Sequence, residues 1–194
     1  MKNGTVPKDP LRLSLIDAAI GLAAREQKIP DPQNLSEKSG IPAGKIVELY
    51  PDLDDLAADA RAVSAARFRH LDDAMPAPAP LPDMLVELVD QRALLYETVG
   101  ELRILQDAGE TFLPSLAQAR AFREGKYRGK LADMLAPHFE GRTLEITSRV
   151  ELLTSWEAWR HLRVVQCLSV EQAKELTLSL LASVASTGHE RPGA

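Results

Sequence analysis

The residues best placed for chemistry are two lysines, Lys38 and Lys45, which lie on either side of a short turn over residues 39–44. The turn contains two glycines and one proline and leads into a short segment with helical apolar spacing. Ammonium groups in such a position can bind the backbone phosphates of duplex DNA, and phosphate contacts supply much of the affinity of protein–DNA complexes. The two lysines are therefore the first candidates for a binding surface.

Side chains suited to catalysis or metal binding show no comparable arrangement. Asp54-Asp55 and Asp72-Asp73 are adjacent pairs, whose members point to different sides of a helix and make poor acid–base partners. The single cysteine, Cys167, lies in an apolar turn, where we expect a buried and inert thiol. The histidines lack the spacing of helical metal ligands: His70, His138, His161 and His189. We therefore expect no metal, no cofactor and no enzymatic activity.

Three helices are expected to position the two lysines. The first carries one apolar face with residues three to four positions apart: Leu15, Ile16, Ala19 and Leu22. The second helix precedes the turn, and the third follows it and ends before Pro51. Asp52 can then cap a fourth helix. The order of helix, turn and short helix is that of a helix-turn-helix module, whose second helix enters the major groove of DNA.

This stretch resembles the head of the TetR family of bacterial transcription regulators. Residues 15–22, Leu-Ile-Asp-Ala-Ala-Ile-Gly-Leu, fill the first block of the family pattern. Its later scaffold positions follow without a gap at Leu35-Ser36, Ser39-Gly40-Ile41, Gly44, Ile46, Tyr50 and Leu56. The resemblance implies an all-α fold of about nine helices, with a three-helix head followed by a larger ligand-binding and dimerisation domain. It also implies a set of DNA-contacting positions: Lys38, Ala43, Gly44, Lys45, Val47 and Glu48.

Several positions that contact DNA in the family carry unusual residues in this chain. Val47 stands at the place of a phosphate-binding tyrosine and is followed by Glu48, while Leu53 replaces a lysine that clamps a phosphate. Pro42 and Asp31 replace a serine and a threonine at helix starts. A basic N-terminal arm over the DNA backbone could compensate for these changes, with three members: Lys2, Lys8 and Arg12.

The charge of the head leaves two interpretations open. Residues 1–56 contain seven Lys and Arg against nine Asp and Glu, a formal charge of −2, whereas a DNA-binding domain normally has a basic face. The leading interpretation is a homodimeric regulator, more readily a repressor, that binds double-stranded operator DNA. The alternative is a protein of the same fold that has lost DNA binding and acts as a lipid- or metabolite-binding accessory protein.

The rest of the chain is expected to be helical as well. A run with four prolines at residues 75–82 breaks the chain, and helical periodicity recurs over residues 52–74, 83–108, 113–139, 142–165 and from 169 onward. We assign residues 1–56 to the head, 57–187 to the effector-binding and dimerisation domain, and 188–194 to a disordered tail. The basic run at residues 120–130 is expected to be a solvated face, with an anionic effector or a membrane surface as the alternative.

The C-terminal region carries a second resemblance to the family. Residues 156–163 and 168–173 are similar to two short TetR motifs, and Ser169 and Gln172 form a capping box. In that family the last two helices form the homodimer interface, and the middle helices enclose a pocket for a small-molecule effector. The interface candidates are Val150, Leu153, Trp159, Leu176, Leu180 and Val184. The candidates for lining the pocket of an unknown small hydrophobic effector are Met84, Tyr96, Phe112, Phe122, Tyr127, Met134 and Trp156.

Composition agrees with a cytoplasmic protein. The 194 residues are 45% hydrophobic, which is enough for a sizeable core, and no apolar run approaches the length that spans a bilayer. The first ten residues do not have the pattern of a secretion signal, and a single cysteine fits a reducing compartment. The net charge of −5 gives no reason to expect general affinity for nucleic acid.

Overall fold

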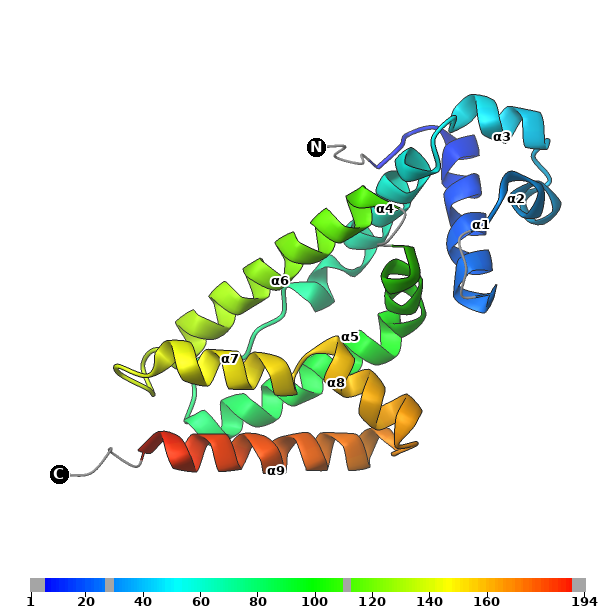
Figure 1. The fold of residues 1–194 in the computed structure, drawn as a ribbon. Helices are drawn as coiled ribbons and strands as arrows, with labels where there is room; N and C mark the ends of the chain where they lie inside the picture. The colour runs from blue at the N-terminus through cyan, green and yellow to red at the C-terminus, as the bar shows by residue number, and fades with distance from the viewer. Residues whose placement is uncertain (1–5, 27–29, 110–112, 190–194) are drawn as a thin grey trace. The chain divides into compact units, whose positions relative to one another are not determined.

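The computed structural model describes residues 6–26, 30–109 and 113–189, and within these ranges its regular elements are helical (Figure 1). In chain order they are α1 (Pro10–Glu26), α2 (Pro32–Ser39), α3 (Ala43–Leu49), α4 (Leu53–Asp72), α5 (Leu81–Gly109), α6 (Pro114–Leu135), α7 (Thr143–Leu153), α8 (Trp156–Arg160), a π-helical segment (His161–Val165) and α9 (Val170–His189). The expected all-α class is confirmed. Across the described ranges, no helix combines the length and apolar character needed to cross a lipid bilayer.

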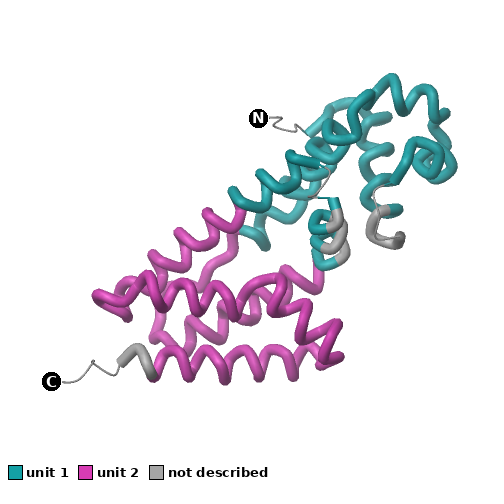
Figure 2. The backbone as a smooth tube through the Cα atoms, in the orientation of Figure 1, with its two compact units in different colours: residues 1–72, 99–122 teal, residues 73–98, 123–194 magenta. Residues whose placement is uncertain are grey.

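The chain divides into two compact units (Figure 2). Unit 1 comprises residues 1–72 and 99–122, and unit 2 comprises residues 73–98 and 123–194. Helices α5 and α6 contribute residues to both. The boundary that we expected between residues 56 and 57 falls one turn into α4, so the assignment of 1–56 and 57–187 to separate functions stays a prediction.

Capping residues in the sequence determine where the helices of the head begin and end. Asp31 caps α2 by accepting a hydrogen bond from the Asn34 backbone N–H at 2.8 Å. Gly40 ends α2 with φ 71°, a left-handed conformation that glycine adopts at little cost. Asp52 accepts from the Asp54 N–H at 2.9 Å, as expected for the cap of α4. The helices then share one core, made of Leu15, Ile16, Ala19, Leu22, Leu35, Ile41, Ile46, Tyr50, Leu56 and Val63.

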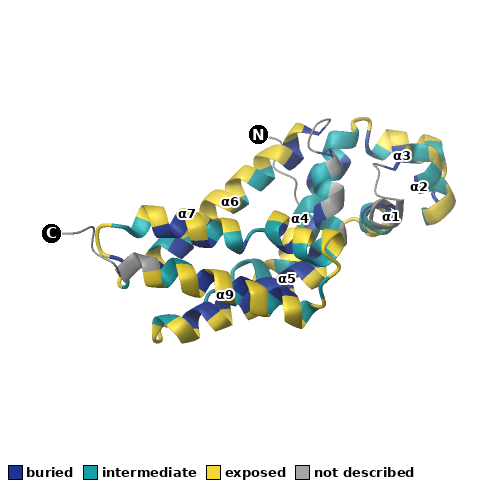
Figure 3. Ribbon diagram, turned by 60° about the horizontal axis from the view of Figure 1, so that its bottom comes forward, coloured by how far each residue is buried: buried dark blue, intermediate teal, exposed yellow. Residues whose placement is uncertain are grey.

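Unit 2 has its own core, to which the beginning of α5 and the C-terminal part of α6 contribute together with α7 and α9. Its buried members are Leu85, Leu88, Val89, Tyr127, Leu131, Leu135, Phe139, Ile146, Val150 and Leu181. α7 packs against α9, and both helices also carry exposed residues on their outer sides (Figure 3). The capping box is confirmed at the start of α9, where the Ser169 and Gln172 side chains each accept the other's backbone N–H.

The helix expected over residues 142–165 is broken in the structure. α7 ends at Leu153, and Ser155 starts α8 by accepting from the Ala158 N–H at 3.1 Å. Ser155 is extended, with φ −74° and ψ 160°. The carbonyl of Thr154 accepts from the Tyr96 hydroxyl at 2.9 Å rather than from the next helical turn. The sequence prediction was wrong here because this tertiary hydrogen bond and the cap together replace helical hydrogen bonds.

Two further expectations about the C-terminal region need correction. Cys167 is exposed rather than buried, because the chain reverses direction there with Cys167 at φ 54°. α9 continues through His189, so the tail expected from residue 188 does not begin there. Residues 190–194 lie outside the described ranges.

Candidate functional site

Helix α3 corresponds to the second helix of the predicted helix-turn-helix module, and it has one buried and one exposed face. Ile46 is 1% exposed and anchors α3 in the core of the head. The opposite face carries Gly44, Lys45, Val47 and Glu48, all of which are exposed. Val47 is 50% exposed although it is apolar. Because a buried isoleucine fixes one side of the helix, the other side is held outward as a recognition surface would be.

The charges on this face are balanced within the helix itself. The Nζ atom of Lys45 lies 2.7 Å from Oε1 of Glu48, and their side chains are 43% and 67% exposed. An exposed pair of this kind is weak, but it has to be broken or shared before Lys45 can bind a phosphate. Ala43 is half-buried at the start of α3, and Lys38 is exposed in the last turn of α2.

Arg12 belongs to the scaffold of the head and not to a free N-terminal arm. It lies in α1, and its guanidinium carbon is 4.9 Å from the centre of the Tyr50 ring. It donates to the Leu49 carbonyl at 3.3 Å and lies 3.9 Å from the Asp59 carboxylate. The expectation for Arg12 is therefore corrected, because these contacts hold the end of α3 against α1 and α4. Lys8 is exposed before α1, and Lys2 lies outside the described residues.

Tyr50 and Leu53 secure the same corner of the head. The Tyr50 hydroxyl donates to the Asp59 carboxylate at 2.9 Å. Burial, together with that acidic partner, raises the pKa of Tyr50 well above its usual range. Leu53 packs against the core of the head, so a packing residue stands where the resemblance places a phosphate-clamping lysine.

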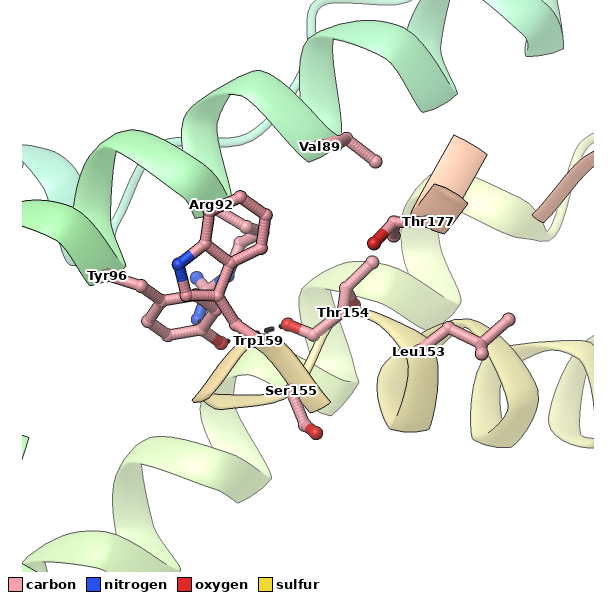
Figure 4. Close-up of a pocket in the computed structure, with 8 residues that line it drawn as sticks. All are labelled: Val89, Arg92, Tyr96, Leu153, Thr154, Ser155, Trp159 and Thr177. Atoms are coloured by element: carbon pink, nitrogen blue, oxygen red, sulfur yellow. Dashed lines mark hydrogen bonds between the residues drawn. The ribbon is translucent and has the colours of Figure 1, made fainter. Parts of the chain in front are cut away.

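A small cavity lies in unit 2, among α5, the α7–α8 break and α9 (Figure 4). The volume open to the centre of a water molecule is about 10 Å³, the space of about one water. Its lining combines apolar, aromatic and hydroxyl side chains with one cation: Val89, Arg92, Tyr96, Leu153, Thr154, Ser155, Trp159 and Thr177.

Arg92 is the charged group of this cavity, and it is only 7% exposed. It donates from Nη2 to the Tyr96 hydroxyl at 2.8 Å. Its guanidinium also stacks on two rings, with the carbon 4.1 Å from the centre of Tyr127 and 4.9 Å from that of Tyr96. Aromatic faces stabilise a buried cation through their quadrupole. The two tyrosines therefore form a cradle for the guanidinium.

The same tyrosines hold the break between α7 and α8. Tyr96 donates to the Thr154 carbonyl at 2.9 Å, and the hydroxyls of Tyr127 and Thr154 lie 2.8 Å apart. Burial raises the pKa of Tyr127 to about 12, against the opposing effect of Arg92, so its hydroxyl keeps its proton at neutral pH. A chain of polar contacts thus runs from Arg92 through Tyr96 to the backbone where α8 begins.

Only some of the residues predicted to line the effector pocket lie at or beside this cavity. Tyr96 lines the cavity, Tyr127 lies beneath Arg92, and Trp156 packs on Tyr96 with ring centres 5.6 Å apart. Phe122 is instead 73% exposed. Met84 is buried, Met134 packs on the core of unit 2, and Phe112 lies outside the described residues.

Arg92 was missed by the sequence analysis, although a signal existed. It lies four residues from Leu88 and four from Tyr96, on the same face of α5 as these buried residues. A charged residue in the middle of a buried helical face is unusual enough to mark a site. The polar residues Thr154, Ser155 and Thr177 carry no such pattern.

Comparisons with known proteins bear on the fold. No protein-family model matches the sequence, and no curated protein matches it. Among solved structures, the chain is similar to a protein from Rhodococcus sp. assigned to the TetR family of transcriptional regulators. The similarity has a TM-score of 0.61, covers 91% of this chain and 100% of that chain, and has 17% sequence identity. The fold is TetR-like. The resemblance noted at both ends of the sequence is thus confirmed at the level of the fold.

Within the TetR-like fold, the predicted interface residues occupy different environments. Val150 is 2% exposed in the core of unit 2, and Trp159 lines the cavity and donates to Glu97 at 2.9 Å. Leu153 and Val184 are half-buried. Leu176 and Leu180 are exposed by 37% and 42%, one helical turn apart on α9. Other exposed apolar residues of unit 2 were not predicted for an interface: Leu144, Leu152, Val164 and Val165.

The basic run at residues 120–130 is largely paired with carboxylates. Arg120 lies 3.5 Å from Asp107 in unit 1. In unit 2, Lys126 and Lys130 share Asp73, and Arg128 lies 2.7 Å from Glu151. These contacts agree with a solvated, charge-balanced surface.

Proposed function

We propose that this chain is a homodimeric transcriptional regulator, acting as a repressor, whose binding to operator DNA is controlled by a small-molecule effector in unit 2. The observation that carries the proposal is the arrangement of α2, Gly40 and α3. The left-handed turn at Gly40 and the burial of Ile46 present Gly44, Lys45 and Val47 outward. A recognition helix of a helix-turn-helix protein needs this presentation.

The exposed leucines of unit 2 support a dimer. Leu176 and Leu180 form one apolar stripe on α9, and Leu144 and Leu152 are 78% and 68% exposed on α7. Contiguous exposed apolar surface on a protein usually marks an interaction site. A second copy of the chain, related by a two-fold axis, would cover these residues with the same surface of its own. Two heads would then read two half-sites of an operator.

The cavity around Arg92 is the proposed effector site. It lies beside the break between α7 and α8, where a change of side-chain contacts can shift a helix end. An effector controls DNA binding only if it binds one conformation more tightly than the other. The hydrogen bonds of Tyr96 and Tyr127 to Thr154 supply contacts that a ligand could exchange.

A second candidate function is favoured by the ion pair on α3. Lys45 is held by Glu48, and the head has a formal charge of −2 over residues 1–56. A protein that has lost DNA binding and acts as a lipid- or metabolite-binding accessory protein would need no free cation there. Fluorescence anisotropy with DNA fragments flanking the gene, at low and moderate salt, distinguishes the regulator from the accessory protein. Preferential binding to one fragment supports the regulator, and no binding even at low salt supports the accessory protein.

A further inference from the structure

We infer that the cavity of unit 2 binds the carboxylate of a small organic acid with an apolar body, and that Arg92 is the residue that receives the carboxylate. The inference rests on the proposed effector site and names the chemical class of its ligand. Its grounds are the burial of the guanidinium, the lining of the cavity and the charges of the surrounding helices.

The first ground is the chemistry of a buried arginine that faces a cavity. Arg92 is 7% exposed and also lines the cavity. A guanidinium is always charged and presents five N–H donors in a planar fork, which matches the two oxygens of a carboxylate. In a desolvated site such charge-assisted pairs are stronger than neutral hydrogen bonds. A ligand carboxylate would therefore find at Arg92 a donor group whose geometry is already fixed by Tyr96 and Tyr127.

The second ground is how the acidic side chains on the surrounding helices are engaged. Asp90 on α5 lies 2.7 Å from Lys174, and Glu97 on the same helix lies 2.8 Å from Arg163. Glu151 on α7 lies 2.7 Å from Arg128. The negative charge of these three carboxylates is balanced locally by those cations, which reduces their repulsion of a ligand carboxylate in the cavity.

The third ground is the rest of the lining. Val89, Leu153 and the ring of Trp159 are apolar surfaces suited to a hydrocarbon or aromatic body. Thr154 and Thr177 complete the lining, and their hydroxyls donate to backbone carbonyls of Val150 and Ala173. A fully polar or highly charged ligand would leave the apolar part of this lining without complementary contacts.

Binding has a structural consequence at the start of α8. In the present state the cavity has space for about one water, so an acid of several carbons enters only as Trp159 and α8 move aside. A carboxylate on Arg92 competes with the Tyr96 hydroxyl, which also holds the Thr154 carbonyl. The segment that follows α8 is π-helical, a form of helix found often at functional sites. The carboxylate is thereby linked to the position of α8.

The test uses the intrinsic fluorescence of the full chain, without DNA. The protein has two tryptophans, Trp156 and Trp159, and both lie beside Tyr96, so ligand entry changes their signal. The probes are sodium hexanoate and sodium benzoate, each compared with its neutral amide and with sodium chloride at equal ionic strength. We expect saturable binding of at least one acid, with its amide at least tenfold weaker. Equal binding of acid and amide, or saturable binding of neither acid, overturns the inference.

Variants assign the effect to the guanidinium. Arg92→Met should remove the preference for acid over amide, and Arg92→Lys, which keeps the charge and loses the fork, should retain a weaker preference. Arg149→Met is the matched control, because it removes an exposed cation of the same unit that pairs with Glu145 and does not line the cavity, and it should bind the acids as the wild type does. If Arg92→Met does not fold by circular dichroism, Arg92→Lys alone decides. Acid binding by the folded Arg92 variants that equals the wild type overturns the inference. Because DNA is absent, failure of the DNA-binding proposal leaves this result unchanged.

Discussion

Removing the acidic partner of Lys45 should strengthen binding to DNA. In Glu48→Gln the 2.7 Å ion pair is lost, and the Lys45 ammonium is free to contact a phosphate. In the wild type this exposed pair, worth about 0.2–1 kcal/mol, keeps the Lys45 ammonium on Glu48 and away from the phosphate. One additional phosphate contact steepens the dependence of log K on log salt by about 0.9. At about 0.1 M salt that contact corresponds to about 1.2 kcal/mol, or about eightfold in affinity for each head.

The assay is fluorescence anisotropy on a labelled duplex over a series of salt concentrations, because the slope reports the number of phosphate contacts. The matched control is Glu140→Gln, which makes the same change of net charge at an exposed residue of unit 2. If the affinity of Glu140→Gln for DNA rises as much as that of Glu48→Gln, the increase comes from net charge alone. If Glu48→Gln changes neither the affinity for DNA nor the salt slope, α3 does not face the DNA.

Three further changes test other parts of the structure. Trp159→Ala should lower the free energy of unfolding by about 3–5 kcal/mol, measured by urea denaturation, because the ring is 5% exposed and its N–H donates to Glu97. A loss below about 1 kcal/mol would contradict that burial. Leu180→Glu should shift the protein from dimer to monomer in light scattering, whereas Leu94→Glu, at an equally apolar exposed position of α5, should not. The pKa of Glu97 is lowered, and the hydrogen bond from Arg163 is the largest of the effects that lower it. The ionised Glu97 carboxylate therefore stabilises the folded protein above the unfolded pKa of about 4.3. This stabilisation is lost as the pH falls through the lower folded pKa. The stability difference between wild type and Glu97→Gln should therefore shrink on acidification below about pH 4, and a difference independent of pH would exclude the pair as its cause.

The local parts of the fold were predictable because their signals lie close together in sequence. Asp52, Gly40 and the pair Ser169–Gln172 each act over a few residues, and each is found in its expected role. The buried face of α1 follows from helical spacing in the same way. These features depend only on backbone hydrogen bonds and on which side of a helix is apolar.

The parts that the sequence did not predict depend on contacts between distant residues. The break after α7 requires Tyr96 to reach the Thr154 carbonyl across 58 residues of sequence. Arg12 was taken for an arm residue because its partners Tyr50 and Asp59 are 38 and 47 positions away. The place of Trp159 at the cavity was not predicted because periodicity identifies an apolar face without identifying what covers it, and its place in a dimer interface stays a prediction. The structure shows the distant residues that Thr154, Arg12 and Trp159 contact.

Specific binding of DNA by the head can be measured by fluorescence anisotropy of the wild-type chain with fragments flanking its gene, at low and moderate salt. If the protein is a regulator, we expect tight binding to one fragment over random DNA of equal length, with an affinity that falls as salt rises. Absence of binding to every fragment at low salt would contradict it, and the ion pair between Lys45 and Glu48 would then be the charge balance of a surface that no longer meets DNA.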